Sequence, residues 1–221
     1  FIDYYFEKLG VLYGWIFQYM PIGYAFTLDL MVTPEQRVKM FHKTQRLVRD
    51  RKIFIADFWN SRTVSHGCIS SGRPGGYLYI NWNGDVTPCV FNPYSPVNVV
   101  NVYKKGGNLN DIISNPFFKA IRTWQKAYIL DRPIDNMGNM IRPCAIKDHY
   151  AMMRAQIDKF NPKPIDQAAD ESLKDDDYRR GLIAYGKKLE ELYSKYPADI
   201  LDVDYNTKMW GELGQTGKFV D

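Results

Sequence analysis

Three cysteines, Cys68, Cys89 and Cys144, lie in segments whose neighbouring residues are mainly glycine, proline or polar. An odd number of cysteines argues against the disulfide framework of small secreted proteins. In a reducing cytosol, cysteines in polar loops bind metals or act in catalysis more often than they form disulfides. Because soft metal centres need thiolates that converge from different segments, we expect these residues to bind one metal centre in a cytoplasmic protein. The alternative is that they are small buried apolar side chains.

A predicted β-hairpin carries the second cysteine back toward the first. The runs Tyr77–Asn81 and Val86–Phe91 flank Asn83-Gly84-Asp85. An Asn-Gly pair between two strand-like runs is a strong signal for a hairpin turn. Fifteen residues separate Cys68 from the glycine of this turn, and four more separate that glycine from Cys89. The return strand can therefore bring the two thiols together.

A glycine-rich loop lies between the first cysteine and the hairpin. Residues 70–76 read Ser-Ser-Gly-Arg-Pro-Gly-Gly, which invites comparison with a phosphate-binding loop. A P-loop ends in Gly-Lys followed by Ser or Thr and leads into a helix, and this segment has neither feature. We interpret it as an ordinary loop.

The first 60 residues have the pattern of a βαβ unit. Residues 1–9 suit the end of a helix, and Val11–Tyr19 and Ile53–Phe58 are apolar runs that suit buried strands. Between the two runs, Thr33 is suited to be the N-cap of a helix with Gln36 at its capping-box position. The two strands should be parallel neighbours. Since they leave sheet edges unpaired, the unit is not expected to be an independent domain.

Helices are predicted on the C-terminal side of the hairpin. Residues 109–128 are broadly helical with a break near Asn115-Pro116, residues 131–143 form a loop, and a helix runs from Asp148 to Phe160. A linker at Asn161–Pro164 then precedes an amphipathic helix. Its apolar residues recur at helical spacing: Leu182, Tyr185, Leu189, Leu192, Tyr193 and Tyr196. We expect this helix to pack on the chain's own body rather than on a membrane or a partner.

The charge is unevenly distributed along the chain. Residues 1–161 carry 20 Lys and Arg against 12 Asp and Glu, a net charge of +8, whereas residues 162–221 carry a net charge of −4. A basic body can attract nucleic acid or another anion, but no arginine-rich run or stacking motif accompanies it. The simpler interpretation is two solvated surfaces, with the acidic tail against the basic body. No apolar run approaches the roughly 20 residues that span a bilayer.

Four motifs carry a resemblance to a known family: Gly67-Cys68, Tyr77-Leu-Tyr-Ile-Asn-Trp-Asn-Gly-Asp-Val-Thr-Pro-Cys89, Leu109-Asn-Asp-Ile-Ile and Phe117-Phe-Lys-Ala-Ile-Arg122. Together they resemble the SPASM or twitch region of radical SAM enzymes. In that family a cysteine, a hairpin and a Gly-x4-Cys motif supply ligands to an auxiliary [4Fe–4S] cluster. Upstream, Tyr19–Gly23 resembles the loop after barrel strand five, and Ile53–Phe58 resembles strand six. The resemblance covers about residues 11–155.

The resemblance implies an α/β fold in three parts. Residues 1–60 would be the C-terminal portion of a partial (β/α)6 TIM-like barrel, residues 61–160 a small α+β hairpin-containing SPASM/twitch-like module, and residues 161–221 a linker and helical tail. Cys68, Cys89 and Cys144 would hold the auxiliary [4Fe–4S] cluster. Five residues at the barrel mouth would line the SAM and substrate cavity: Tyr19, Met20, Pro21, Asp57 and Asn60. Core packing is the alternative for Tyr19 and for Trp59.

The sequence departs from the family pattern in two ways. Full SPASM domains carry a later Cys-x2-Cys-x5-Cys-x3-Cys run, and here only Cys144 occupies that region. One auxiliary cluster, as in the shorter twitch form, is therefore the most we expect. The Cys-x3-Cys-x2-Cys motif of the SAM-cleaving cluster does not occur in the chain. Because the chain starts at Phe1 without an initiator Met, we expect a preceding part of the same enzyme to bind SAM and a second [4Fe–4S] cluster.

The fourth iron of the auxiliary cluster has several candidate ligands. His66, Asp148 and His149 lie near cysteines in the sequence, although each also suits a loop, a helix cap or a hydrogen bond to a sulfur. A substrate bound to a vacant iron is a further alternative. The implied function is radical SAM chemistry on a small-molecule or peptide substrate, with an electron donor such as ferredoxin or flavodoxin. The alternative function is a free-standing metal-binding module that transfers electrons or contacts nucleic acid.

Overall fold

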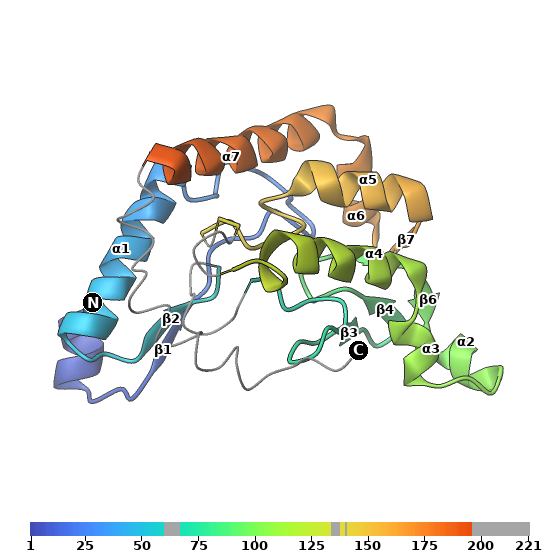
Figure 1. Ribbon diagram of the computed structural model, residues 1–221, viewed down its shortest axis with the longest axis horizontal. Helices are drawn as coiled ribbons and strands as arrows, with labels where there is room; N and C mark the ends of the chain where they lie inside the picture. Colours follow the sequence, from blue (N-terminus) through green and yellow to red (C-terminus); the bar gives the residue numbers. More distant parts are fainter. Residues whose placement is uncertain (60–66, 134–137, 140, 196–221) are drawn as a thin grey trace.

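The computed structural model describes residues 1–59, 67–133, 138–139 and 141–195. Helices cover one side of the molecule, and three small sheets lie beneath them (Figure 1). Three of the residues considered above, Asn60, His66 and Tyr196, lie outside the described residues. None of the described helices is long and apolar enough to cross a bilayer.

The N-terminal part forms the predicted βαβ unit. Strand β1 (Gly14–Ile16) pairs in parallel with β2 (Ile55–Asp57), and α1 (Pro34–Asp50) lies between them in sequence and packs on β2. Both parts of the capping box predicted at Thr33 are present. A short helical segment, η1 (Asp3–Lys8), precedes β1. The paired segments are three residues long, and in the described structure each strand has a single neighbour. These strands do not form a closed barrel by themselves.

The predicted antiparallel pairing is present, but the turn differs from the expected one. Strand β3 (Tyr79–Ile80) pairs with β4 (Asp85–Thr87), and β6 (Val97–Asn98) joins the other edge of β4. The turn spans residues 81–84 rather than being centred on the Asn-Gly pair. The side-chain oxygen of Asn81 accepts hydrogen bonds from two backbone N–H groups, and Gly84 closes the turn at φ +81°. A side-chain-bonded asparagine and a left-handed glycine favour this longer turn.

A third sheet involves the segment that the sequence presents as a linker. Strand β5 (Tyr94–Ser95) pairs antiparallel with β7 (Lys163–Pro164). Pro164 is tolerated at this position because an edge strand need not donate every backbone hydrogen bond. The segment between the cysteine region and the tail is therefore fixed to the body by backbone pairing. The proposed division of the chain at residues 60 and 160 stays a prediction.

In the part of the chain that the structure describes, the hairpin is followed by these helices and helical segments: α2 (Val99–Lys104), α3 (Leu109–Ile113), α4 (Pro116–Gln125), η2 (Lys126–Leu130), α5 (Tyr150–Phe160), α6 (Gln167–Lys174) and α7 (Asp176–Lys195). The predicted break near Asn115 is confirmed, because the Asn115 side chain caps α4. The helix predicted to start at Asp148 starts two residues later. Asp148 is instead bonded to other parts of the chain, as described below.

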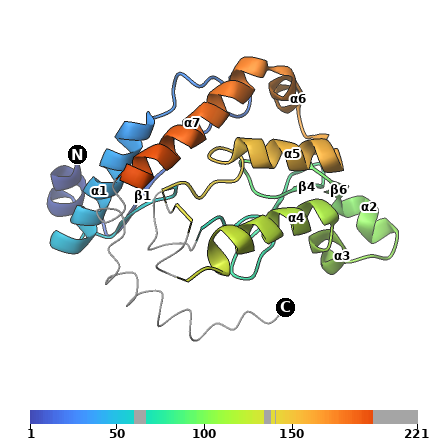
Figure 2. The ribbon, with the colours of Figure 1, turned by 45° about the horizontal axis from the view of Figure 1, so that its top comes forward.

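One apolar core connects all three parts of the sequence. Met20 and Trp59 from the N-terminal part share it with residues of α4 and α5 and with Leu182 of α7. Helix α7 contacts α1, α5 and α6, as Figure 2 shows from above. Leu182 and Leu189 are fully buried in these contacts. The prediction that the amphipathic helix packs on the chain's own body is confirmed, although Tyr196 lies outside the described residues.

Candidate metal centre

Each cysteine lies where a loop meets a regular element. Cys68 lies in the loop before β3, and its sulfur is 3.1 Å from the hydroxyl oxygen of Ser70. Cys89 follows β4, where its carbonyl accepts hydrogen bonds from the Thr87 hydroxyl and from the backbone N–H of Asn92. Cys144 lies before α5, and its carbonyl accepts from two backbone N–H groups at the start of that helix. All three are free thiols and only partly exposed.

Electrostatic interactions show that the three thiols are neighbours. Burial raises the pKa of Cys89, and the negative charges of Cys68 and Cys144 raise it further. Burial raises the pKa of Cys144 to about 12, with further contributions from the charges of Asp148 and Cys68. Tyr77 interacts with all three, since its pKa is raised first by burial and then by the charges of the three thiolates. The segments that carry the cysteines therefore approach one another around Tyr77.

Backbone N–H groups favour the thiolate form at two of these residues. The N–H groups of Phe91 and Asn92 bond the Cys89 thiol, and that of Lys147 bonds the Cys144 thiol, and both effects lower the thiol pKa. Without a counter-charge, three thiolates buried together would repel one another. An iron–sulfur cluster provides irons that bind thiolates directly. The donor set therefore fits such a cluster in its chemistry.

Among the described residues, no group of three His, Cys, Asp or Glu side chains is placed to hold one metal ion. A single ion draws all its ligands to one point, whereas each thiolate of a four-iron cluster binds a different iron.

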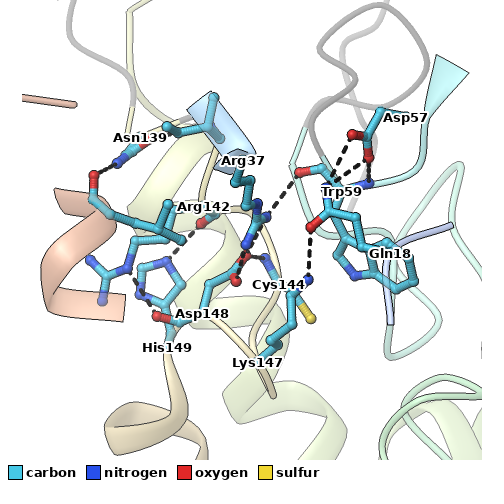
Figure 3. A network of polar contacts seen from close by, with 12 residues as sticks. Gln18, Arg37, Asp57, Trp59, Asn139, Arg142, Cys144, Lys147, Asp148 and His149 are labelled. Atoms are coloured by element: carbon cyan, nitrogen blue, oxygen red, sulfur yellow. Dashed lines mark hydrogen bonds and ion pairs between the residues drawn. The ribbon is translucent and has the colours of Figure 1, made fainter. Parts of the chain in front are cut away.

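A buried ion pair positions the segment that carries Cys144 (Figure 3). Arg37 of α1 donates through both terminal nitrogens to the carboxylate of Asp148, and both side chains are fully buried. Arg37 also donates to the carbonyl of Trp59 at 3.2 Å. The same carboxylate accepts from the backbone N–H of Cys144 at 3.0 Å. The position of this cysteine is thus coupled to the helix of the βαβ unit.

The two described candidates for the fourth ligand, Asp148 and His149, both make other contacts. The two carboxylate oxygens of Asp148 are occupied by Arg37 and by the Cys144 N–H. His149 donates from Nε2 to the carbonyl of Arg142, and its ring packs edge-on against two aromatic rings of α4 and η2. Burial and then the charge of Arg142 lower the pKa of His149 to about 4. These contacts give both residues a positioning role, and a ligand role for either stays a prediction.

A second polar group lies at the ends of β1 and β2. Gln18 donates to both carboxylate oxygens of Asp57 at 3.1 Å, and the backbone N–H of Trp59 donates to the same carboxylate. Lys147 donates to the side-chain amide oxygen of Gln18 at 3.4 Å, and its ammonium nitrogen lies 4.6 Å from the centroid of the Trp59 ring. Burial lowers the pKa of Lys147 to about 8. No sequence pattern marks Gln18 or Lys147, since their interaction joins residues 129 positions apart.

The other strand-end residues are held by packing and by backbone bonds. The Tyr19 hydroxyl donates to the carbonyl of Ala25, and the Pro21 carbonyl accepts from the Tyr178 hydroxyl of α7. Met20 and Trp59 lie in the apolar core. For Trp59, the core-packing alternative is therefore the one the structure supports. A cofactor-binding role for Tyr19, Met20, Pro21 and Asp57 stays a prediction.

Comparison with protein families gives a match to part of the chain. Residues 68–144 match the model of the SPASM domain, described as an iron–sulfur cluster-binding domain. The resemblance drawn from the sequence motifs is thereby confirmed for this segment, and an iron–sulfur cofactor is supported. Comparison with curated proteins and with solved structures gives no match.

Proposed function

We propose that this chain is the C-terminal half of a cytoplasmic radical SAM enzyme and that it holds an auxiliary [4Fe–4S] cluster on Cys68, Cys89 and Cys144. The observation that carries the proposal is the extent of the family match. It begins at Cys68 and ends at Cys144, and it contains Cys89. All three thiols that interact electrostatically thus belong to the segment that resembles a cluster-binding domain.

The exposed apolar surface of the N-terminal part favours an incomplete barrel rather than a free-standing module. Residues around β1 and β2 expose large apolar side chains, with Trp15 54% exposed and Phe54 63% exposed. Leu12, Tyr13 and Phe17 are exposed as well. Contiguous exposed apolar surface beside an unpaired strand edge marks an interaction site. Preceding βα units of the same enzyme would pair with this edge and cover this surface.

The chain's own residues would position the cluster and keep water away from it. When bound, the cluster would supply an electron or an iron that binds the substrate. The Arg37–Asp148 pair would fix Cys144, and backbone N–H groups would stabilise the thiolates of Cys89 and Cys144. Asp57 would face the substrate and SAM cavity from the end of β2. SAM cleavage would belong to the preceding part, with ferredoxin or flavodoxin as electron donor.

Cluster binding can be tested on this chain alone. After anaerobic reconstitution with iron and sulfide, we expect about four irons per chain and the absorption and electron paramagnetic resonance of a [4Fe–4S] cluster. Cys89→Ser keeps the size of the side chain but replaces the thiol by a poor iron ligand, and it should lose most of the iron. Ser114→Ala, which changes an exposed residue at the end of α3 that is not proposed as a ligand, is the control. Equal iron contents in wild type and Cys89→Ser would contradict the proposed ligand set.

The enzyme role needs the full-length protein. Cys89→Ala should abolish product formation while SAM cleavage stays measurable, because the SAM-cleaving cluster would be separate. Product formation at the wild-type rate would show that the auxiliary site is structural. The reading frame upstream of Phe1 provides a second test. A frame without Cys-x3-Cys-x2-Cys would favour the free-standing metal-binding module instead.

A further inference from the structure

A large groove is lined in part by the loop that follows Cys68. It has a volume of about 940 Å³ and lies between residues 72–74 and one face of α4 and η2. Arg73 lines the groove, and burial lowers its pKa although the charge of Cys68 acts in the opposite direction. Its volume lies at the upper end of the range for pockets that bind small molecules.

The charges that line this groove are mainly positive. Four cationic side chains and one acidic side chain line it: Arg73, Lys119, Arg122, Lys126 and Asp131. Lys119 and Lys126 are exposed and stand seven residues apart, so they lie on the same face of the helix, about 10 Å from each other along its axis. Low-dielectric walls lined by one sign of charge concentrate ligands of the opposite sign.

The wall of the groove is held in place by side chain to backbone bonds. Arg122 donates to the carbonyl oxygens of Ser71 and Ile113, at 2.7 and 2.9 Å. These bonds join α4 to the glycine-rich loop and to the end of α3. The loop is therefore fixed relative to the helix that carries the lysines, which pre-organises the site for a ligand.

One residue that lines the groove carries a buried hydrogen-bond acceptor without a partner among the described residues. Gln125 lines the groove and is only 3% exposed. Its amide nitrogen donates to the carbonyl and the hydroxyl oxygen of Ser70, at 3.1 and 3.2 Å. Because a carbonyl can only accept, these bonds fix the nitrogen on the Ser70 side. The amide oxygen is left without a partner among the described residues, although buried polar groups normally have one.

We propose that this groove binds a small molecule that carries a phosphate or carboxylate group and donates an N–H or O–H hydrogen bond to Gln125. The oxyanion would contact Lys119 and Lys126, and the ligand's hydrogen-bond donor would bind the amide oxygen of Gln125. Recognition rests on side-chain cations rather than on the backbone N–H groups of a P-loop, which explains why residues 70–76 need not match that motif. The site needs no metal, so its test does not depend on whether the chain binds the proposed cluster.

The test is a titration of the metal-free chain with inorganic pyrophosphate and, separately, with citrate, by isothermal calorimetry at low ionic strength. We expect binding of pyrophosphate, of citrate or of both, and the probe that binds indicates whether phosphate or carboxylate chemistry is recognised. Lys119→Glu/Lys126→Glu should weaken binding at least tenfold. Lys104→Glu/Lys105→Glu makes the same charge change on and just after α2, away from the groove residues, and should weaken binding far less.

Two further variants guard against effects on folding. Lys119→Glu alone changes one exposed residue and should still weaken binding severalfold, with an unchanged circular dichroism spectrum. Gln125→Leu keeps all four cations but removes the acceptor, and it should weaken binding of citrate, whose hydroxyl group can donate a hydrogen bond. The proposal would be overturned if neither pyrophosphate nor citrate bound. An equal loss in the groove variant and in the Lys104/Lys105 variant would also overturn it.

Discussion

The terminal nitrogens Nη1 and Nη2 of Arg37 lie 2.5 and 2.9 Å from the two carboxylate oxygens of Asp148, and neither side chain is exposed to solvent. The two residues are 111 positions apart in the sequence. Arg37 belongs to α1 of the βαβ unit, and Asp148 accepts a bond from the backbone of Cys144. One bidentate pair thus connects the barrel-like part to the cysteine region.

Removing one partner of this pair should destabilise the protein strongly. Arg37→Met or Asp148→Leu leaves the other charge buried without compensation, and such changes cost about 3–5 kcal/mol. The double variant removes both charges and should cost clearly less than the sum of the single changes. Denaturant unfolding of all four proteins measures the difference. Additive losses in the double variant would contradict the coupling.

Tyr178 should make stability depend on pH in the alkaline range. Its hydroxyl donates to the Pro21 carbonyl, and burial, followed by the charges of nearby tyrosines, raises its pKa well above 10. The raised pKa means that its contribution is fully present below about pH 10 and is lost as the pH rises further, by about 1 kcal/mol per pH unit. Tyr178→Phe should therefore be less stable than wild type at pH 9, and the gap should narrow by pH 11. A constant gap between the two unfolding free energies would disprove the assignment.

Two glycines of α7 provide a matched pair of substitutions. A Cβ at Gly186 would collide with the backbone carbonyl of Asp148, whereas a Cβ at Gly181 would meet only the end of the Leu28 side chain. Both changes to alanine gain about 1 kcal/mol of helix propensity. Gly186→Ala should nevertheless lower the unfolding free energy by about 1–3 kcal/mol, because a backbone cannot move aside as a side chain can. Gly181→Ala should be close to neutral, and thermal unfolding would reveal the reverse order if this reasoning is wrong.

Local signals in the sequence predicted much of the fold. The helix start at Thr33 and the break at Asn115 depend on residues within three positions, and both appear as expected. The parallel pairing of β1 and β2 follows from the helix between them. The hairpin turn begins at Asn81 rather than being centred on Asn83-Gly84, because the Asn81 side chain accepts hydrogen bonds from two backbone N–H groups.

The contacts that position the candidate site could not be predicted in the same way. Arg37–Asp148 and Gln18–Lys147 join distant segments, and no periodicity marks any of these four residues. Asp148 was singled out only because it is close to Cys144 in sequence. Its actual partner, Arg37, lies four residues before Phe41 on the buried face of α1, a face on which the pattern alone predicts apolar residues. Buried ion pairs of this kind appear only once the tertiary packing is known.

The last prediction concerns Lys147, a buried cation close to Cys144, and it depends on the proposed cluster. The charges of Lys147 and Cys144 act on each other, and the lysine is held by Gln18 and the Trp59 ring. A nearby positive charge stabilises the reduced, more negative form of a cluster. Lys147→Met should therefore lower the reduction potential of the reconstituted cluster, by tens of millivolts in order of magnitude.

Potentiometric titration of the reconstituted chain, followed by electron paramagnetic resonance, measures this shift. Lys159→Met removes the same charge from an exposed position on α5 and should change the potential much less, because solvent screens exposed charges. Equal shifts in the two variants would show that only net charge matters. An unchanged potential in Lys147→Met, with full iron content, would place the cluster away from Lys147 and so away from Cys144.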